Sequence, residues 1–222
     1  MYTPIDVSAL IYYPFDDETG GTNLGSGGAA YNSPYGGSVR STYKVVGTGG
    51  IGFGDYTYNS ACFVPTFDTG STGLSFAFWF QFSGSAALSR IIDFGSYYGR
   101  SNKIVFGLDH DNDVFVECTG AVAGASFEKK SLFGLNVNDG KWRHVAWTID
   151  TSGNWLIYLN GALQKTYYSV YYPNSVTLTS NYLGTSGCGW WIDNWVVGAV
   201  DEFYMLQSVL SRAQVQELYN QG

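Results

Sequence analysis

Large apolar side chains alternate with small or polar ones along residues 145–150, and this period of two is typical of a strand with one buried face. A turn-rich stretch and a second apolar run follow. Asn160-Gly161 then provides the strongest short signal for a hairpin. We therefore predict an antiparallel meander of three strands at 145–150, 155–159 and 162–166.

Other apolar runs bounded by Gly, Asn, Asp or Ser extend the same pattern along the chain. Residues 74–82 carry aromatic side chains at both odd and even positions, which point to opposite faces of a strand. We therefore expect this strand to be central and covered on both faces. Between residues 20 and 54 we expect a long loop, strand-like only at 43–46 and 51–53. The remaining predicted strands lie at 10–16, 90–95, 103–108, 114–119, 177–184 and 195–205.

One helix is predicted, near the end of the chain. Ser211 and Gln214 have the spacing of a capping box, in which each side chain bonds the backbone N–H of the other. Val215, Leu218 and Tyr219 then share one face of a short helix. About a dozen strands with one terminal helix predict an all-β fold, a two-sheet antiparallel sandwich of the jelly-roll type.

The meander closely resembles the central hairpin of laminin-G-like and concanavalin A-like jelly-roll domains. Their usual form is a DG-x-W-H-x-V-A strand, a turn and an LYVNG strand. Here residues 139–147 read DGKWRHVAW, with Arg143 between Trp142 and His144, and 156–161 read LIYLNG. The closing VDEFY strand at 200–204 and the helix ending in LY also match. The resemblance spans the chain and implies a single domain over residues 1–222.

Composition narrows the classes of function. The chain carries 18% aromatic residues and 29 glycines but only 13% charged residues, which suits short strands around one large core. A net charge of −7 argues against nucleic acid as a main partner. No apolar stretch reaches membrane-spanning length, and no secretory signal pattern follows Met1. We nevertheless favour a surface-exposed location, extracellular or on a virion.

Cysteine chemistry adds little. Cys62, Cys118 and Cys188 are odd in number, so at least one is unpaired, and none lies close to another in the sequence. Buried, reduced thiols explain the pattern better than a disulfide framework or a metal site.

Catalytic motifs are absent from the sequence. The related glycosidases carry a Glu-x-Asp-x-Glu run on one strand, and this chain has none. The acidic stretch at 109–113 (DHDND) lies between two apolar runs, so we interpret it as a hairpin turn rather than a calcium loop, whose Gly and Glu it lacks. His110 and His144 have no Ser or Cys in a nucleophile motif. We predict a protein that is not an enzyme, with a glycoside hydrolase or lyase as the less favoured alternative.

Aromatic clusters are the stronger candidates for function. Sugar rings stack on Trp or Tyr while neighbouring Asp and Asn bond the hydroxyls, and the resemblance to lectin-type folds fits this chemistry. The competing interpretation is that the same aromatics fill the core or a protein interface. The candidate ligand-binding residues are Trp190, Trp191, Asp193, Asn194, Tyr171 and Tyr172.

A calcium ion is implied only by the resemblance, because many related domains hold calcium between loops at one rim. The matching oxygen donors here are Asp16, Asp17 and Asp201. In the competing interpretation these side chains begin a turn or bond the backbone.

The predicted function is that of a non-catalytic binding module that recognises carbohydrate at a surface, in adhesion or attachment. The alternative is a structural or decoration protein of a virus particle or surface assembly that binds protein. The expected partner is thus a glycan or a surface protein, without insertion into a membrane, and a homo-oligomer stays open.

Overall fold

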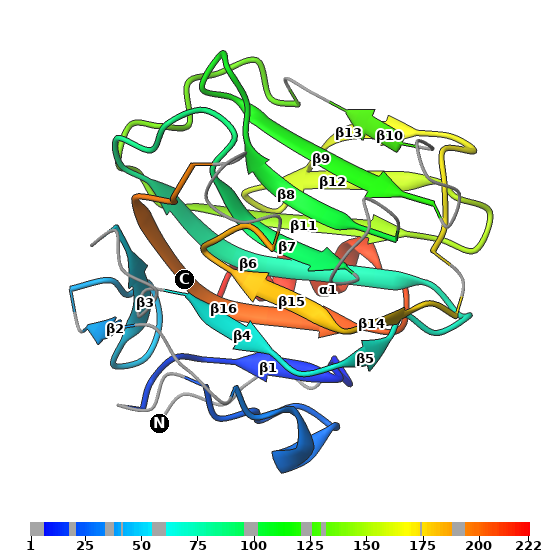
Figure 1. The fold of residues 1–222 in the computed structure, drawn as a ribbon, viewed down its shortest axis with the longest axis horizontal. Helices are drawn as coiled ribbons and strands as arrows, with labels where there is room; N and C mark the ends of the chain where they lie inside the picture. Colours follow the sequence, from blue (N-terminus) through cyan, green and yellow to red (C-terminus); the bar gives the residue numbers. More distant parts are fainter. Residues whose placement is uncertain are drawn as a thin grey trace.

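A computed structural model describes residues 7–17, 21–33, 38–40, 42–54, 61–95, 102–120, 126–129, 132–173, 175–187 and 194–222. For residues 38–40 and 126–129 only the backbone is described. The chain forms two antiparallel sheets packed face to face, with one helix outside them (Figure 1). This confirms the predicted all-β sandwich with a short C-terminal helix.

The larger sheet has eight strands. Along its main path they are ordered β13 (Ala162–Tyr167), β12 (Trp155–Leu159), β11 (Arg143–Ile149), β6 (Leu74–Phe82), β16 (Gly198–Leu206), β3 (Gly50–Phe53) and β2 (Ser38–Arg40). The eighth strand, β1 (Ile11–Tyr13), pairs with β16.

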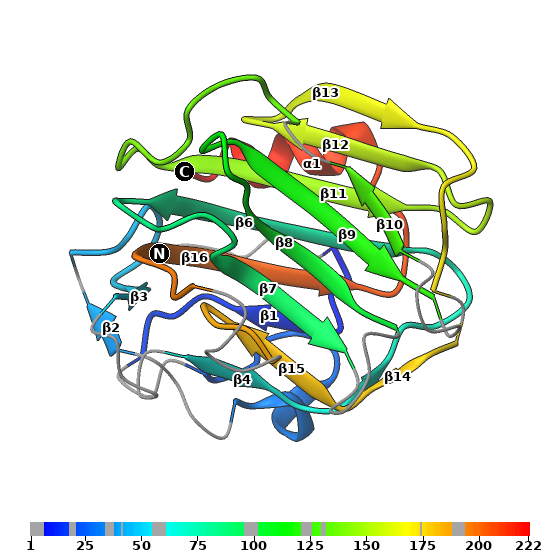
Figure 2. The same ribbon diagram turned by 45° about the horizontal axis from the view of Figure 1, so that its top comes forward.

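The smaller sheet has six strands, which lie in front in Figure 2. They are ordered β10 (Ser126–Lys129), β9 (Val114–Thr119), β8 (Ile104–Leu108), β7 (Arg90–Gly95), β15 (Ser180–Leu183) and β4 (Cys62–Val64). A separate pair joins β14 (Thr177–Leu178) to β5 (Phe67–Asp68), and a short 3-10 helix, η1, covers Gly28–Tyr31.

The core between the sheets is rich in phenylalanine. Phe78 of β6 meets Phe106 of β8 edge to face, with ring centroids 5.1 Å apart, and Phe76 meets Phe94 of β7 at 6.0 Å. Such edge-to-face pairs add roughly 0.5–1.5 kcal/mol each beyond the burial of area. Strand β6 is central and buried except at Gln81, as predicted.

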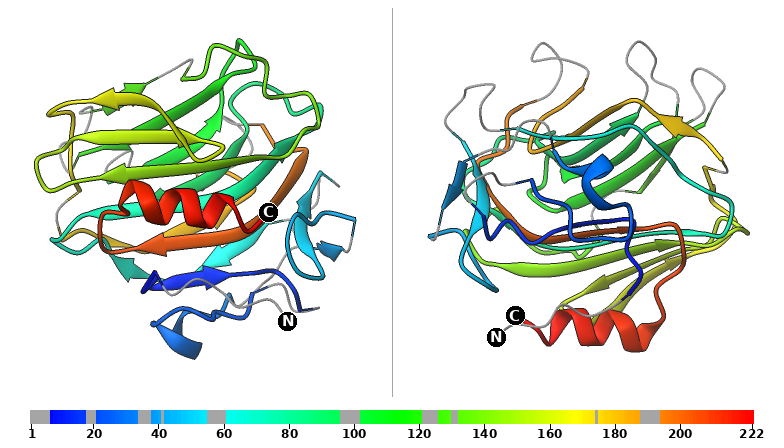
Figure 3. Two further views of the ribbon diagram at one scale, coloured as in Figure 1. Left: turned by 180° about the vertical axis from the view of Figure 1, so that it is seen from behind. Right: turned by 90° about the horizontal axis from the view of Figure 1, so that it is seen from below.

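Helix α1 (Arg212–Tyr219) lies on the outer face of the larger sheet, away from the smaller one (Figure 3). The predicted capping box is present at Ser211 and Gln214. Val215 and Leu218 are buried against the sheet, and Tyr219 stacks on Trp79 with centroids 5.6 Å apart. Among the residues that the structure describes, no helix has the length and apolar character needed to cross a membrane.

This helix corrects one prediction. Strand β11 was expected to bury a single face, but all seven of its residues are buried. The core side chains at Val145, Trp147 and Ile149 face the smaller sheet, while Ala146 belongs to the cluster that packs beneath α1. Because alanine is small and only weakly apolar, Ala146 did not indicate a second buried face in the sequence. In the fold its small side chain lets the helix approach closely.

Two predicted strands also differ. Residues 43–46 form no strand, because the N–H groups of Val45 and Val46 donate to the carboxylate of Asp201 instead of to a neighbouring strand. The segment 177–184 divides at Thr179 into β14 and β15, which pair in different sheets.

The hairpin turn at Asn160-Gly161 is confirmed. Both residues have positive φ, 50° and 75°, which is the geometry of a type I′ turn. A Cβ on Gly161 would lie 2.9 Å from side-chain atoms of Gln216 and Tyr219. The turn therefore supports α1 as well as joining β12 to β13.

Candidate functional site

The candidate residues Trp190, Trp191 and Asp193 lie outside the described residues, but both flanks of their segment are described. The first flank is Gly184–Gly187 and the second is Asn194–Val197. Both flanks bond the same short stretch, residues 85–93, which leads into and forms the first part of β7. We call residues 85–93 the clamp.

The first flank is held at the end of the clamp. The N–H of Gly184 donates to the carbonyl of Ile91 at 2.9 Å. The hydroxyl of Ser186 and the N–H of Gly187 both donate to Oδ2 of Asp93, each at 2.9 Å.

The second flank is held at the start of the clamp. The side-chain amide of Asn194 donates to the carbonyl of Ala87 at 2.6 Å, and Ser89 Oγ donates to the carbonyl of Trp195 at 2.7 Å. Ser85 Oγ accepts from the N–H of Val197 and donates to its carbonyl. Every second clamp residue from 85 to 93 thus contributes at least one contact.

Asp93 lies within a row of side chains across the outer face of the smaller sheet. In the strand register Asp93 stands opposite Tyr182, which stands opposite Phe63. The two aromatic rings meet edge to face at 5.0 Å, and both residues are partly exposed. A Cβ on Gly187 would come within 3.0 Å of the Tyr182 ring, so the first flank lies against this row.

The candidate ligand-binding residues Tyr171 and Tyr172 form part of the packing around the core. Both are partly buried and pack against the main core cluster. The carbonyl of Tyr171 accepts the indole N–H of Trp155 at 2.7 Å, and the hydroxyl of Tyr172 donates to the carbonyl of Gly70 at 2.8 Å. Tyr168 is instead 77% exposed. Nothing in the tyrosine-rich run of the sequence distinguishes Tyr168 from its neighbours, so the sequence did not predict that its side chain is exposed.

Two of the aspartates predicted as calcium ligands accept hydrogen bonds from the loop at residues 45–49. Asp201 is fully buried and accepts the N–H groups of Val45 and Val46 at 2.7 and 3.0 Å. Asp16 accepts the N–H groups of Thr48 and Gly49. Backbone donors thus bond Oδ1 of Asp16 and Oδ2 of Asp201, as in the competing interpretation.

Two further observations bear on the metal. Asp17 is partly exposed beside Asp16. Within the described ranges, no three His, Cys, Asp or Glu residues gather as a metal-binding group. Burial raises the pKa of Asp201 to about 7, against the lowering effect of the amides that it accepts. Calcium binding stays a prediction.

The acidic stretch at 109–113 is a hairpin turn between β8 and β9, as predicted. Oδ1 of Asp109 accepts the N–H groups of Asp111 and Asp113 at 2.8 and 3.0 Å, and Asp113 in turn accepts from Phe133 and Gly134. Both buried carboxylates are therefore used to hold loops.

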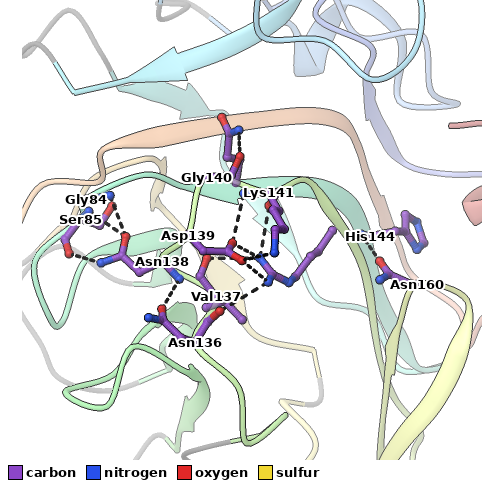
Figure 4. A network of polar contacts seen from close by, with 12 residues as sticks. Gly84, Ser85, Asn136, Val137, Asn138, Asp139, Gly140, Lys141, His144 and Asn160 are labelled. Carbon is purple, nitrogen blue, oxygen red and sulfur yellow. Dashed lines mark hydrogen bonds and ion pairs between the residues drawn. The ribbon is translucent and has the colours of Figure 1, made fainter.

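The predicted DGKWRH motif forms a polar network at the start of β11 (Figure 4). Arg143 is buried and donates through both terminal nitrogens to the carboxylate of Asp139, at 2.8 and 3.0 Å. This guanidinium holds the pKa of Asp139 well below its usual range. Asn138 ties the same loop to the end of β6 by accepting the N–H groups of Gly84 and Ser85.

His144 lies beneath α1, with its ring against Trp79 and Tyr219 at 5.4 and 6.0 Å. Burial lowers the pKa of His144 to about 3, so the imidazole is neutral near pH 7. Its position under the helix fits the predicted structural role. Two cysteines, Cys62 and Cys118, are buried free thiols, and burial raises the pKa of both.

Comparison with protein families gives one match. A family model described as the concanavalin A-like lectin/glucanases superfamily matches residues 54–216. A search of curated proteins finds no match.

Solved structures share the fold at low sequence identity. Domain 4 of AbnA, an extracellular GH43 arabinanase from Geobacillus stearothermophilus solved with arabinotriose, matches with a TM-score of 0.66 and 16% identity, covering 96% of this chain and 98% of that domain. The botulinum neurotoxin serotype D ligand-binding domain, solved with N-acetylneuraminic acid, matches with a TM-score of 0.67 and 15% identity. The binding domain of Paraclostridial Mosquitocidal Protein 1 matches with a TM-score of 0.68 and 12% identity.

The extent of these matches differs. The chain is similar to nearly the whole arabinanase domain, but it spans about half of the two toxin domains, 50% and 52%, while 96% of the chain is covered in each case. At these identities the likeness establishes the fold.

Proposed function

The chain belongs to the concanavalin A-like lectin/glucanases superfamily, and we propose that it is a non-catalytic module that binds carbohydrate at a surface, in adhesion or attachment. Two similar structures support the proposal, because they were solved with arabinotriose and with N-acetylneuraminic acid. Since a fold hosts many functions, the assignment depends on residues of this chain.

The observation that carries the proposal is the clamp. The segment between the two flanks contains Trp190, Trp191 and Asp193, and residues 85–93 hold the flanks on both sides of it. Binding sites gain affinity when their residues are ordered before the ligand arrives. The two flanks, which are fastened to one stretch of chain, meet that requirement.

We assign the stacking role to Trp190 and Trp191 and the hydrogen-bonding role to Asp193 and Asn194. The exposed Asn194 already donates its amide N–H to the clamp, so its carbonyl oxygen is the atom assigned to the ligand. Tyr171 and Tyr172 pack against the core cluster and receive no ligand contact in this scheme. No calcium ion is needed in this scheme.

The side chains also support a function without catalysis. General acid and base groups need pKa values near the working pH and access to the substrate. Asp93 is buried among four donors, and burial keeps His144 neutral under a helix. A glycoside hydrolase would show turnover of a polysaccharide that a single Asp or Glu substitution abolishes.

Binding to a broad panel of immobilised glycans, with calcium and again with chelator, tests the proposal. We expect saturable binding to one glycan class in both conditions. Trp190→Ala and Trp191→Ala should each weaken it by about tenfold or more, the effect of removing an aromatic anchor. Tyr168→Ala removes an exposed aromatic outside this segment and serves as the matched control. Absence of binding to every glycan in both conditions would refute the proposal.

The second candidate is a structural or decoration protein that binds protein on a virus particle or surface assembly. A similar structure, the binding domain of botulinum neurotoxin DC, was solved with rat synaptotagmin II, so a related fold occurs in a complex with a protein. This candidate predicts a defined oligomer or a stoichiometric protein partner, with Trp190→Ala disturbing assembly. Sedimentation of the purified protein distinguishes the two.

A further inference from the structure

The last turn of α1 covers a histidine. His144 of β11 stands opposite Trp79 of β6, and the ring of Tyr219 contacts both, with centroids 5.6 Å from Trp79 and 6.0 Å from His144. His144 is 2% exposed, and its Nδ1 has no hydrogen-bond partner among the described residues. Both nitrogens of a protonated imidazole are donors. A proton on His144 would therefore bury a charge together with a donor that lacks an acceptor, which is strongly unfavourable.

Neighbouring charges do not offset this cost. Apart from tyrosines, the ionisable residues on the elements around this ring are Arg212 and Glu217 of α1, Arg143 of β11, and Asp201 and Glu202 of β16; β6 and β12 carry none. Arg143 bonds Asp139 at the start of β11. Asp201 accepts backbone N–H groups, and Glu202 accepts two tyrosine hydroxyls. Burial, not a neighbouring charge, lowers the pKa of His144 to about 3.

Helix α1 is short, and its attachment to the sheet is small. Its eight residues bury Val215 and Leu218, which share one apolar cluster with Ala77 and Ala146 of the sheet. Isolated helices shorter than about 12–15 residues are marginal in water, so α1 depends on this packing. Segments with few buried apolar contacts open locally more often than the core of a fold. Release of α1 would expose His144 to water and leave the strand pairs of both sheets in place.

We propose that α1 is released by acid: protonation of His144 favours a state in which the helix leaves the outer face of the larger sheet while the two sheets stay packed. This inference does not rest on glycan binding. The pKa of His144 is about 3 with the helix docked, and its ordinary value of 6.5 applies once the ring faces water. Because the released state binds the proton more tightly, docking weakens as the pH falls from 6.5 toward 3. Release should become about tenfold more frequent for each pH unit in this range.

Amide hydrogen exchange tests the proposal. It is expressed as protection relative to an unstructured chain, because the chemical exchange rate itself changes with pH. The amides of residues 215–220 report on α1, and those of β6 report on global unfolding. His144→Gln removes the titrating ring, with His144→Asn as a second neutral replacement should that variant fail to fold. The matched control is His110→Gln, since His110 is exposed in the turn between β8 and β9.

Between about pH 7 and pH 4.5, protection of residues 215–220 should fall by about a hundredfold in the unchanged protein and in His110→Gln. It should stay below the protection of β6 throughout, since the helix opens without global unfolding. Replacing His144 should remove this dependence on pH. Ser211→Ala, which removes the N-cap of α1, should keep it while lowering protection about fivefold at every pH.

Three results would overturn the inference. The first is protection of α1 that equals that of β6, because the helix would then open only when the whole protein unfolds. The second is protection of α1 that does not change with pH in the unchanged protein or in Ser211→Ala. The third is the same dependence on pH after His144 has been replaced, which would assign the proton to another group.

Discussion

At the scale of single residues, the buried charges of this protein hold loops. Arg143 donates to the Asp139 carboxylate and to the carbonyls of Asn136, Val137 and Lys141. A guanidinium can serve acceptors in several directions because its donors form a rigid planar fork. This residue stands within a family-like motif and ties the loop before β11 to the sheet.

Arg143→Lys should lower the free energy of unfolding by about 1–3 kcal/mol, because an ammonium cannot replace the bidentate contact with Asp139. Urea denaturation measures the change. Lys141→Ala is the control: its side chain is 77% exposed, and surface ion pairs contribute about 0–1 kcal/mol. Equal losses in the two variants would contradict the assigned role of Arg143.

His144 should make the protein sensitive to acid. Its pKa is about 3 in the folded protein and 6.5 in the unfolded chain, so below pH 6.5 only the unfolded state gains the proton. Stability should fall as the pH drops from 6.5 toward 3, by at most about 1.4 kcal/mol per pH unit from this group. Thermal unfolding across this range should show a shallower loss for His144→Gln, whereas the exposed His110→Gln should follow the wild type.

At the scale of elements, the turn after β12 and helix α1 are coupled. Gly161 has φ +75° and leaves no room for a Cβ next to Gln216 and Tyr219. Gly140 has nearly the same φ, +74°, but has no atom within 4 Å of its Cβ position. Comparing alanine substitutions at Gly140 and Gly161 therefore separates the effect of backbone strain from the effect of contact with the helix.

Gly140→Ala should cost about 1 kcal/mol from strain alone, and Gly161→Ala should cost more, because the added methyl group displaces the last turn of α1. Chemical denaturation of both variants measures the difference. If Gly161→Ala is no more harmful than Gly140→Ala, the turn does not support the helix.

At the scale of the whole molecule, hydrogen bonds of the loop at 45–49 join distant parts of the chain. Asp16 follows β1, Asp201 belongs to β16, and each bonds backbone N–H groups of this loop. Excess chelator should leave the melting temperature unchanged, as differential scanning calorimetry would show. A fall of several degrees that added calcium reverses would instead reveal a bound ion.

Much of the fold was predictable because its signals are local. The capping box at Ser211 and the Asn160-Gly161 turn each depend on a few neighbouring residues. The burial of Ala146 was not predictable, because it requires α1 to pack over β11 from far along the chain. Tyr168 and Tyr172 look alike in the sequence, yet Tyr168 is exposed and the hydroxyl of Tyr172 bonds Gly70.

The sequence by itself determined the class of fold, the strands of the meander and the position of the helix, because periodicity, turn conformation and capping act between near neighbours. Only the tertiary structure decided where the candidate segment is attached. Asp93 lies 93 positions before Ser186, and Ser85 lies 112 before Val197. Contacts across such distances depend on the order of strands and on the packing of sheets, which no local pattern encodes.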